Sequence, residues 1–194
     1  ASIFSRKASA SQSSNKCDMS FPRAGVSMRV LRSLAAWVQW EEERLAKLQQ
    51  SSSGSGRNGS AVVHLPTSVV CSRIVLPLTM ETQTSFVELL ELQPPTSELG
   101  TIDTGKATHF LSHTWRLSFG ETFSAVETFV AEEMNGQEEG IYFWVDILSV
   151  NQHHANDNMY DQNWWSSTFT TGIREIGHTV LVLSPFEDPQ ALKR

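Results

Sequence analysis

The chain has 194 residues, of which 40% are hydrophobic and 19% charged, proportions typical of a folded globular protein. Fifteen lysines and arginines against 21 aspartates and glutamates give a net charge of −6, and the basic residues form no cluster, so we expect no nucleic acid partner. No run of about 18 apolar residues occurs, which predicts no membrane insertion. Two cysteines in unlike contexts are too few for a disulfide framework, which favours a reduced, cytoplasmic setting.

The first 60 residues are predicted to form three segments. Residues 1–22 form a disordered tail, because Ser, Ala, Asn and Lys dominate and apolar residues show no period. Residues 23–50 form an amphipathic helix, which either packs on its own protein or docks a partner. Residues 51–60, rich in Ser and Gly, form a flexible linker. The apolar residues of the helix recur at spacings of three and four: Val30, Leu34, Trp37, Val38, Leu45 and Leu48.

Residues 61–103 are predicted to be a mixed extension with a short helix. An apolar run from Val69 to Leu76 ends at Pro77. The spacing of Ser85 and Glu88 indicates a capping box, which opens a helix that must end before two consecutive prolines, Pro94 and Pro95. We expect this stretch to abut the following domain rather than to fold by itself.

Residues 104–194 alternate between strand and helix patterns. His109–His113 is predicted to be a strand, and a second capping box at Ser118 and Glu121 opens a helix that ends at Asn135-Gly136. The near-continuous apolar run Ile141–Leu148 is typical of a strand that is buried on both faces of a parallel sheet. The order strand, helix, strand therefore begins an α/β unit.

The unit continues with a helix and a third strand. A polar loop at 151–163 precedes a helix that we expect Ser166 or Ser167 to cap and Gly177 to end, and the last strand is Thr179–Leu183. The predicted fold class is α/β, a partial flavodoxin-like parallel sheet with flanking helices, preceded by a disordered and helical N-terminal extension. Because a three-stranded sheet leaves two open edges, we expect the native protein to continue past the end of this chain.

Candidate binding residues follow the three predicted strands. In open α/β sheets, ligands bind outside the carboxyl ends of the strands, so the loops there should converge. Their side chains offer aromatic rings, a cation, a carboxylate and hydrogen-bonding groups, which would suit a nucleotide. The structural alternatives stay open: Asp146 caps a turn, His113 is a structural hydrogen-bonding group, Arg116 is solvated, and the pair Trp164-Trp165 fills a core or a domain seam. The candidates are His113, Trp115, Arg116, Asp146, Asn151, Gln152 and Phe186.

Metal and nucleophile chemistry find little support in the sequence. His109 and His113 lie four residues apart, about 13 Å along an extended strand, too far apart for one zinc ion. No C-x-x-C, H-E-x-x-H or G-x-S-x-G spacing occurs. We therefore expect neither a metal site nor a nucleophilic hydrolase.

Several short motifs together resemble the TIR-like domain family. The match covers residues 104–194, under half of the chain, and depends on the order and spacing of the motifs. Three details resemble a divergent TIR-like group found in multidomain proteins: Trp144-x-Asp146, Asn151-Gln152-His153 and Trp164-Trp165. The strand motifs are Phe110-Leu111-Ser112, Gly140 to Asp146, and Val180-Leu181-Val182-Leu183-Ser184, the last preceded by Phe169, Ile173 and Ile176.

The resemblance implies one of two functions. TIR-like domains act in signalling by self-association or by binding other TIR-like domains, and some members hydrolyse NAD(P). In the hydrolytic members the catalytic glutamate follows the third strand in a W-C-x-x-E-like segment, which would place it beyond Arg194, since Glu187 and Asp188 come too early. We therefore expect no catalytic residue in this chain, inactivity of the chain alone, no required cofactor, and NAD(P) only as a substrate of the longer protein.

Overall fold

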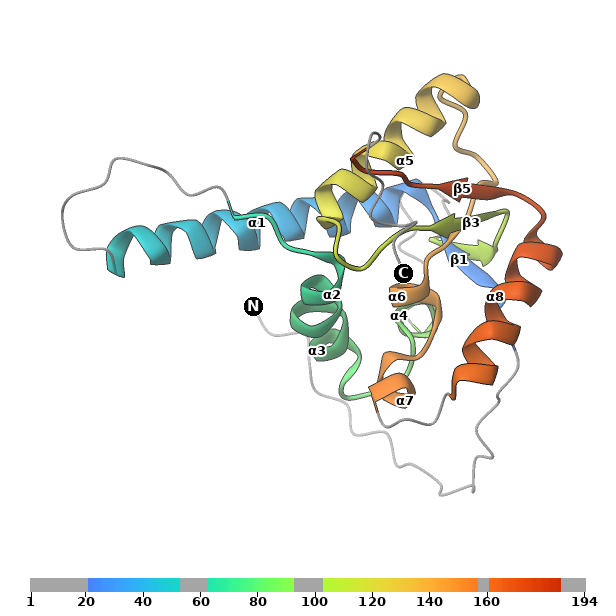
Figure 1. Ribbon diagram of the computed structural model, residues 1–194, viewed down its shortest axis with the longest axis horizontal. Coiled ribbons are helices and arrows are strands. Elements are labelled where there is room, and N and C mark those ends of the chain that lie inside the picture. The colour runs from blue at the N-terminus through green and yellow to red at the C-terminus, as the bar shows by residue number, and fades with distance from the viewer. Residues whose placement is uncertain (1–20, 53–62, 93–102, 157–160, 186–194) are drawn as a thin grey trace.

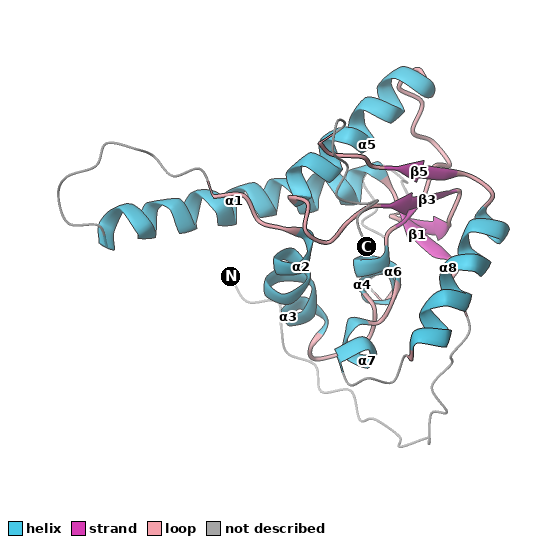
Figure 2. Cartoon of the chain, viewed as in Figure 1, coloured by secondary structure: helices cyan, strands magenta, loops and turns pink. Residues whose placement is uncertain are grey.

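The computed structural model describes residues 21–52, 63–92, 103–156 and 161–185. These residues form an α/β fold, as the sequence predicts. The sheet has five strands and is mixed, with helices on both faces (Figures 1 and 2). The strands lie in the order β2-β1-β4-β3-β5. Within the described ranges, no helix has both the length and the hydrophobicity needed to cross a membrane. Most of the predicted tail and most of the predicted linker lie outside the described residues. The tail was nevertheless predicted too long, because Phe21 stacks on Trp144 with ring centroids 5.6 Å apart.

The three predicted strands lie side by side and run parallel. β3 (His109–Ser112) pairs on one side with β4 (Phe143–Trp144) and on the other with β5 (Thr179–Leu181). β4 is shorter than predicted, because Asp146–Ser149 forms the short helix α6. A continuous apolar run does not distinguish a buried strand from a buried helix, and here the run contains both.

Two antiparallel strands extend the sheet on the β4 side. β1 (Ala24–Val26) pairs with β4 and with β2 (Thr104–Lys106). The expectation of a three-stranded sheet with two open edges is therefore wrong, since β1 covers the edge of β4. The segment that forms β1 had been assigned to the start of a helix. Three-residue strands are too short to show a period of two, so neither was evident in the sequence.

The long helix α1 spans Met28–Ser52, so it begins and ends later than the predicted 23–50. It packs across the sheet beside α5 (Phe119–Glu133). The predicted helix start is confirmed for α5: Ser118 Oγ accepts from Glu121 N at 3.1 Å. Arg32 of α1 joins the two helices on their exposed side, donating to Glu127 and to Glu138.

The extension between α1 and the sheet is more helical than the sequence indicates. α2 (Thr67–Val70), a π-helical turn (Cys71–Val75) and α3 (Leu76–Thr79) form one continuous helix. The sequence predicts no helix over this apolar run, and Pro77 lies inside the helix without interrupting it. A proline ring clashes with the carbonyl four residues before it, and here that carbonyl belongs to Arg73, inside the widened π turn.

The capping box of α4 (Phe86–Glu91) is confirmed. Ser85 Oγ accepts from Glu88 N at 3.2 Å, and Ser85 N donates to Glu88 Oε2 at 2.7 Å. α4 packs against α6, and α2 contacts the loop after β3, so the extension abuts the α/β unit as expected. The two prolines that follow α4 lie outside the described residues.

The second crossover differs from the prediction at its start. Part of the predicted loop forms α7 (Gln152–Asn156), and α8 spans Gln162–Ile176. Asp161 caps α8, accepting from Trp164 N at 2.7 Å, in place of the predicted Ser166 or Ser167. The tryptophan pair therefore lies in the first turn of the helix. Gly177 ends α8 as predicted, in the left-handed conformation with φ of 83°.

Two hydrophobic clusters cover the two faces of the sheet. Leu111 faces the larger one, which contains Val38 of α1 and Val126 of α5. Its neighbour Phe110 points to the opposite face, where it stacks on Trp144 with ring centroids 4.7 Å apart. The tryptophans of α8 pack against this second cluster, so the core-filling interpretation of Trp164-Trp165 describes their position.

Candidate functional site

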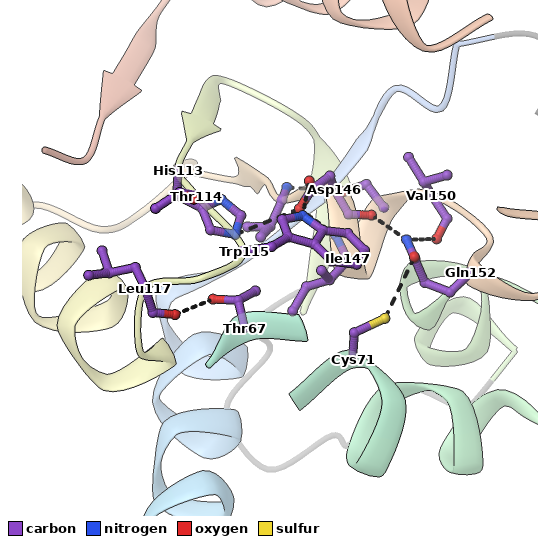
Figure 3. A network of polar contacts seen from close by, with 12 residues as sticks. Thr67, Cys71, His113, Thr114, Trp115, Leu117, Asp146, Ile147, Val150 and Gln152 are labelled. Atoms are coloured by element: carbon purple, nitrogen blue, oxygen red, sulfur yellow. Dashed lines mark hydrogen bonds and ion pairs between the residues drawn. The ribbon is translucent and has the colours of Figure 1, made fainter. Parts of the chain in front are cut away.

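The loops after β3 and β4 meet where these parallel strands have their carboxyl ends, as the parallel arrangement requires. We call this side of the sheet the carboxyl edge. His113 and Trp115 follow β3, and Asp146 begins α6 directly after β4. Figure 3 shows these side chains close together, next to the start of α2. The backbone N–H groups of Thr67 and Ser68 donate to the carbonyls of Leu117 and Trp115, at 3.0 and 3.1 Å, and so fasten α2 over the loop.

The Asp146 carboxylate is buried and its two oxygens are occupied by donors of the protein itself. Asp146 is only 7% exposed. Its Oδ2 accepts from Trp115 Nε1 at 2.7 Å, and its Oδ1 accepts from Ile147 N at 2.7 Å. A carboxylate in the first turn of a helix also interacts favourably with the helix dipole. The turn-capping interpretation of Asp146 thus agrees with its geometry.

His113 lies beside this carboxylate without a hydrogen bond. Its side chain is 2% exposed, and Nε2 lies 3.8 Å from Asp146 Oδ1, within ion-pair range but beyond hydrogen-bond length. Nε2 has no hydrogen-bond partner. A buried polar atom left in this state costs about 1–3 kcal/mol. His113 is therefore the one candidate at this edge whose polar group the described residues leave unsatisfied.

Gln152 and Cys71 extend the cluster on the far side of Asp146. Gln152 Nε2 donates to the carbonyls of Asp146 and Val150, at 2.9 and 3.1 Å, and the Cys71 thiol donates to Gln152 Oε1 at 3.6 Å. Burial, followed by the nearby Asp146 charge, raises the pKa of the Cys71 thiol to about 12. A thiol that stays protonated is a poor nucleophile, so Cys71 contributes packing and a hydrogen bond. Cys71 lies 75 positions before Asp146 in the chain, and no pattern in the sequence indicated that the two residues are close.

Asn151 fastens the loop after β4 to the extension. Its Nδ2 donates to the Gln83 carbonyl at 2.7 Å, and its Oδ1 accepts from His153 N at 3.0 Å. His153 Nε2 lies 2.9 Å from the Thr79 hydroxyl. The motif Asn151-Gln152-His153 therefore holds three segments together, and its polar atoms face the protein.

The remaining candidates lie outside this cluster. Arg116 is exposed, in agreement with its interpretation as a solvated residue, and Phe186 lies outside the described residues. In the part of the chain that the structure describes, no three His, Cys, Asp or Glu side chains gather as a metal ion requires. A hollow of about 530 Å³ lies between α1 and α5, but no candidate residue lines it.

Comparisons with protein-family models, curated proteins and solved structures give no match. The resemblance to the TIR-like family thus depends on the sequence motifs alone.

Proposed function

We propose that this chain carries a TIR-like signalling module that acts by protein–protein association, with itself or with other TIR-like domains. The observation that supports the proposal best is that the Asp146 carboxylate is buried and hydrogen-bonded within the protein. A ligand-binding carboxylate must be accessible, whereas Asp146 is only 7% exposed and both of its oxygens already accept from groups of the protein, Trp115 and Ile147. The carboxyl edge then serves as a rigid surface that presents loops to a partner.

The exposed groups at this edge fit a protein partner. Arg116 projects from a loop that Trp115 and Thr67 hold from both sides. A cation on a fixed loop can select an acidic partner surface without a change of conformation on binding. β5 lies at the end of the sheet, and Leu181 on it is 49% exposed. These features favour association over nucleotide binding for the chain itself.

A charge reversal at Arg116 tests the proposal. We expect Arg116→Glu to weaken self-association or capture of a second TIR-like domain by at least about tenfold, since like charges at an interface repel. Arg174→Glu is the matched control, because Arg174 is also exposed but lies near the end of α8. Equal binding by both variants and the parent chain, measured by biolayer interferometry, would count against the carboxyl edge as the contact surface.

Hydrolysis of NAD(P) by the longer protein is the second candidate, and the unsatisfied Nε2 of His113 favours it. A substrate hydroxyl or phosphate that reached this atom would complete its hydrogen bonding. The chemistry would still require the glutamate that the resemblance places beyond Arg194. Turnover of NAD by the longer protein, abolished by a Glu→Ala change at that position, would support this candidate, and absence of turnover would remove it.

A further inference from the structure

The second half of α1 extends past the body of the protein. All buried residues of the helix lie between Met28 and Val38, and none of the residues from Gln39 to Ser51 is buried. Figure 1 shows the end of α1 projecting away from the sheet. Helices outside a packed core are marginal in water, because most of their stability comes from a buried apolar face. Contacts of this half with the rest of the described chain include Leu45, which packs partly buried against the core, and Glu42, which accepts from Leu65 N at 2.7 Å.

Six exposed residues form a seam along one face of α1. They recur at spacings of four, three, four, three and four, the repeat with which two helices wind around each other. Two of them are tryptophans, Trp37 and Trp40, which are 42% and 58% exposed. Exposed tryptophan pairs are unusual away from interfaces. The six residues are Ser33, Trp37, Trp40, Arg44, Lys47 and Ser51.

The seam is complementary to the same seam of a second copy when the two helices run antiparallel. In an antiparallel helix pair, one register places Trp40 against Arg44 of the second copy and Trp37 against Lys47 of the second copy. The same register places Ser33 against Ser51. A parallel pair would instead align each cation with its own counterpart, which is repulsive. The charge pattern thus selects the antiparallel arrangement and a twofold-symmetric contact.

Arg44 is held in a form that suits this contact. Its Nε and Nη2 donate to the two carboxylate oxygens of Glu41, each at 2.6 Å. These bonds use the edge of the guanidinium plane and leave its flat face available, which is the face that stacks on an aromatic ring. Trp40, one turn earlier on α1, keeps its ring exposed in the same way.

We infer that α1 pairs with α1 of a second copy of this chain in an antiparallel, cation–π-layered homodimer. This surface lies outside the α/β unit, so it goes beyond the proposed function and adds a second means of self-association. The seam spans about 27 Å of helix. A contact of this length is smaller than the interface of an obligate dimer, so we expect a dissociation constant in the micromolar range. Antiparallel pairing keeps the two bodies at opposite ends of the contact.

Sedimentation of the full chain between about 1 and 200 µM tests the pairing. We expect a concentration-dependent dimer, weakened at least about tenfold by Trp40→Ala. The change leaves the fold intact, since this side chain is mostly exposed, and an unchanged melting temperature at a protein concentration too low for dimerisation checks this. Gln39→Ala, exposed but off the seam, is the matched control. A monomer at all concentrations, or equal dimerisation by both variants, overturns the inference.

Cysteine cross-linking tests the direction of the pair. In a Cys17→Ser background, an equimolar mixture of Ser33→Cys and Ser51→Cys chains should give disulfide-linked heterodimers, and each variant alone should give few. Cross-links within each variant alone would indicate parallel helices and contradict the register. Gln39→Cys should form few cross-links in any mixture.

The outcomes separate this inference from the proposed function. Loss of the dimer by Arg116→Glu, with no effect of Trp40→Ala, would overturn the α1 pairing and leave the carboxyl edge as the contact. The reverse result would support the pairing and count against the carboxyl edge.

Discussion

The indole Nε1 of Trp115 donates to Oδ2 of Asp146 at 2.7 Å, which ties the loop after β3 to the first turn of α6. The two residues are 31 positions apart in the chain, and Figure 3 shows them close together next to α2. The bond satisfies a buried carboxylate and fixes an aromatic side chain with a single contact. It therefore determines both the stability and the shape of the carboxyl edge.

Removal of this donor should destabilise the fold even when an aromatic ring is kept at the position. Trp115→Phe leaves one Asp146 oxygen without its donor in a buried setting, which should lower the free energy of unfolding by about 1–3 kcal/mol. Urea unfolding followed by circular dichroism measures the change. Trp40→Phe, at an exposed position, should shift the midpoint little when measured at low protein concentration. Equal effects of the two changes would show that the bond contributes nothing specific.

Cys71 should make stability fall in alkaline solution. Burial raises its pKa from 9.0 to about 12, so folding favours the protonated thiol. Its contribution is fully present below pH 9 and is lost as the pH rises toward 12. Cys71→Ala should therefore flatten the decline in unfolding free energy between pH 9 and 11, although it lowers stability at pH 7 by leaving a small cavity. An unchanged slope in the variant would contradict the assignment.

The parallel part of the fold follows from the sequence because its signals are local and mutually consistent. Capping at Ser118, the left-handed Gly177 and the buried Phe143-Trp144 each specify a boundary or an environment without knowledge of the tertiary structure. β1 and β2 were missed for the opposite reason. A three-residue strand such as Ala24–Val26 has too few side chains to show a period, and only its pairing with Phe143 defines it.

The candidate site, too, was predictable from the sequence only in part. Parallel strands end at one edge of the sheet, so the proximity of His113 and Asp146 was predictable. The hydrogen bonds that their polar atoms form were not predictable, because they depend on which rotamers the packing permits. Trp115 was a candidate binding residue, and the structure shows that its Nε1 donates to Asp146. Cys71 gave no signal, since its neighbours in sequence are ordinary apolar residues.

His109 should make the fold sensitive to acid. Burial, followed by the charge of His178, lowers its pKa below 6.5, so the folded protein binds a proton less readily than the unfolded chain. Its contribution is present above pH 6.5 and is lost as the pH falls below that value. His109→Gln should reduce the difference in unfolding free energy between pH 7 and pH 5. His64→Gln, at an exposed position, is the control and should leave that difference unchanged.

Gly25 should tolerate no side chain, because β1 approaches β4 too closely. A Cβ at this position would lie 2.7 Å from the Phe143 carbonyl oxygen, and backbone atoms in the middle of a sheet cannot move aside cheaply. Gly25→Ala should cost about 1–3 kcal/mol of unfolding free energy. Gly120→Ala is the matched control: a Cβ there meets nothing within 4 Å, and alanine favours the first turn of α5 by up to about 1 kcal/mol. The two variants should therefore shift the urea midpoint in opposite directions, and a shift in the same direction would argue that β1 does not pair with β4 in solution.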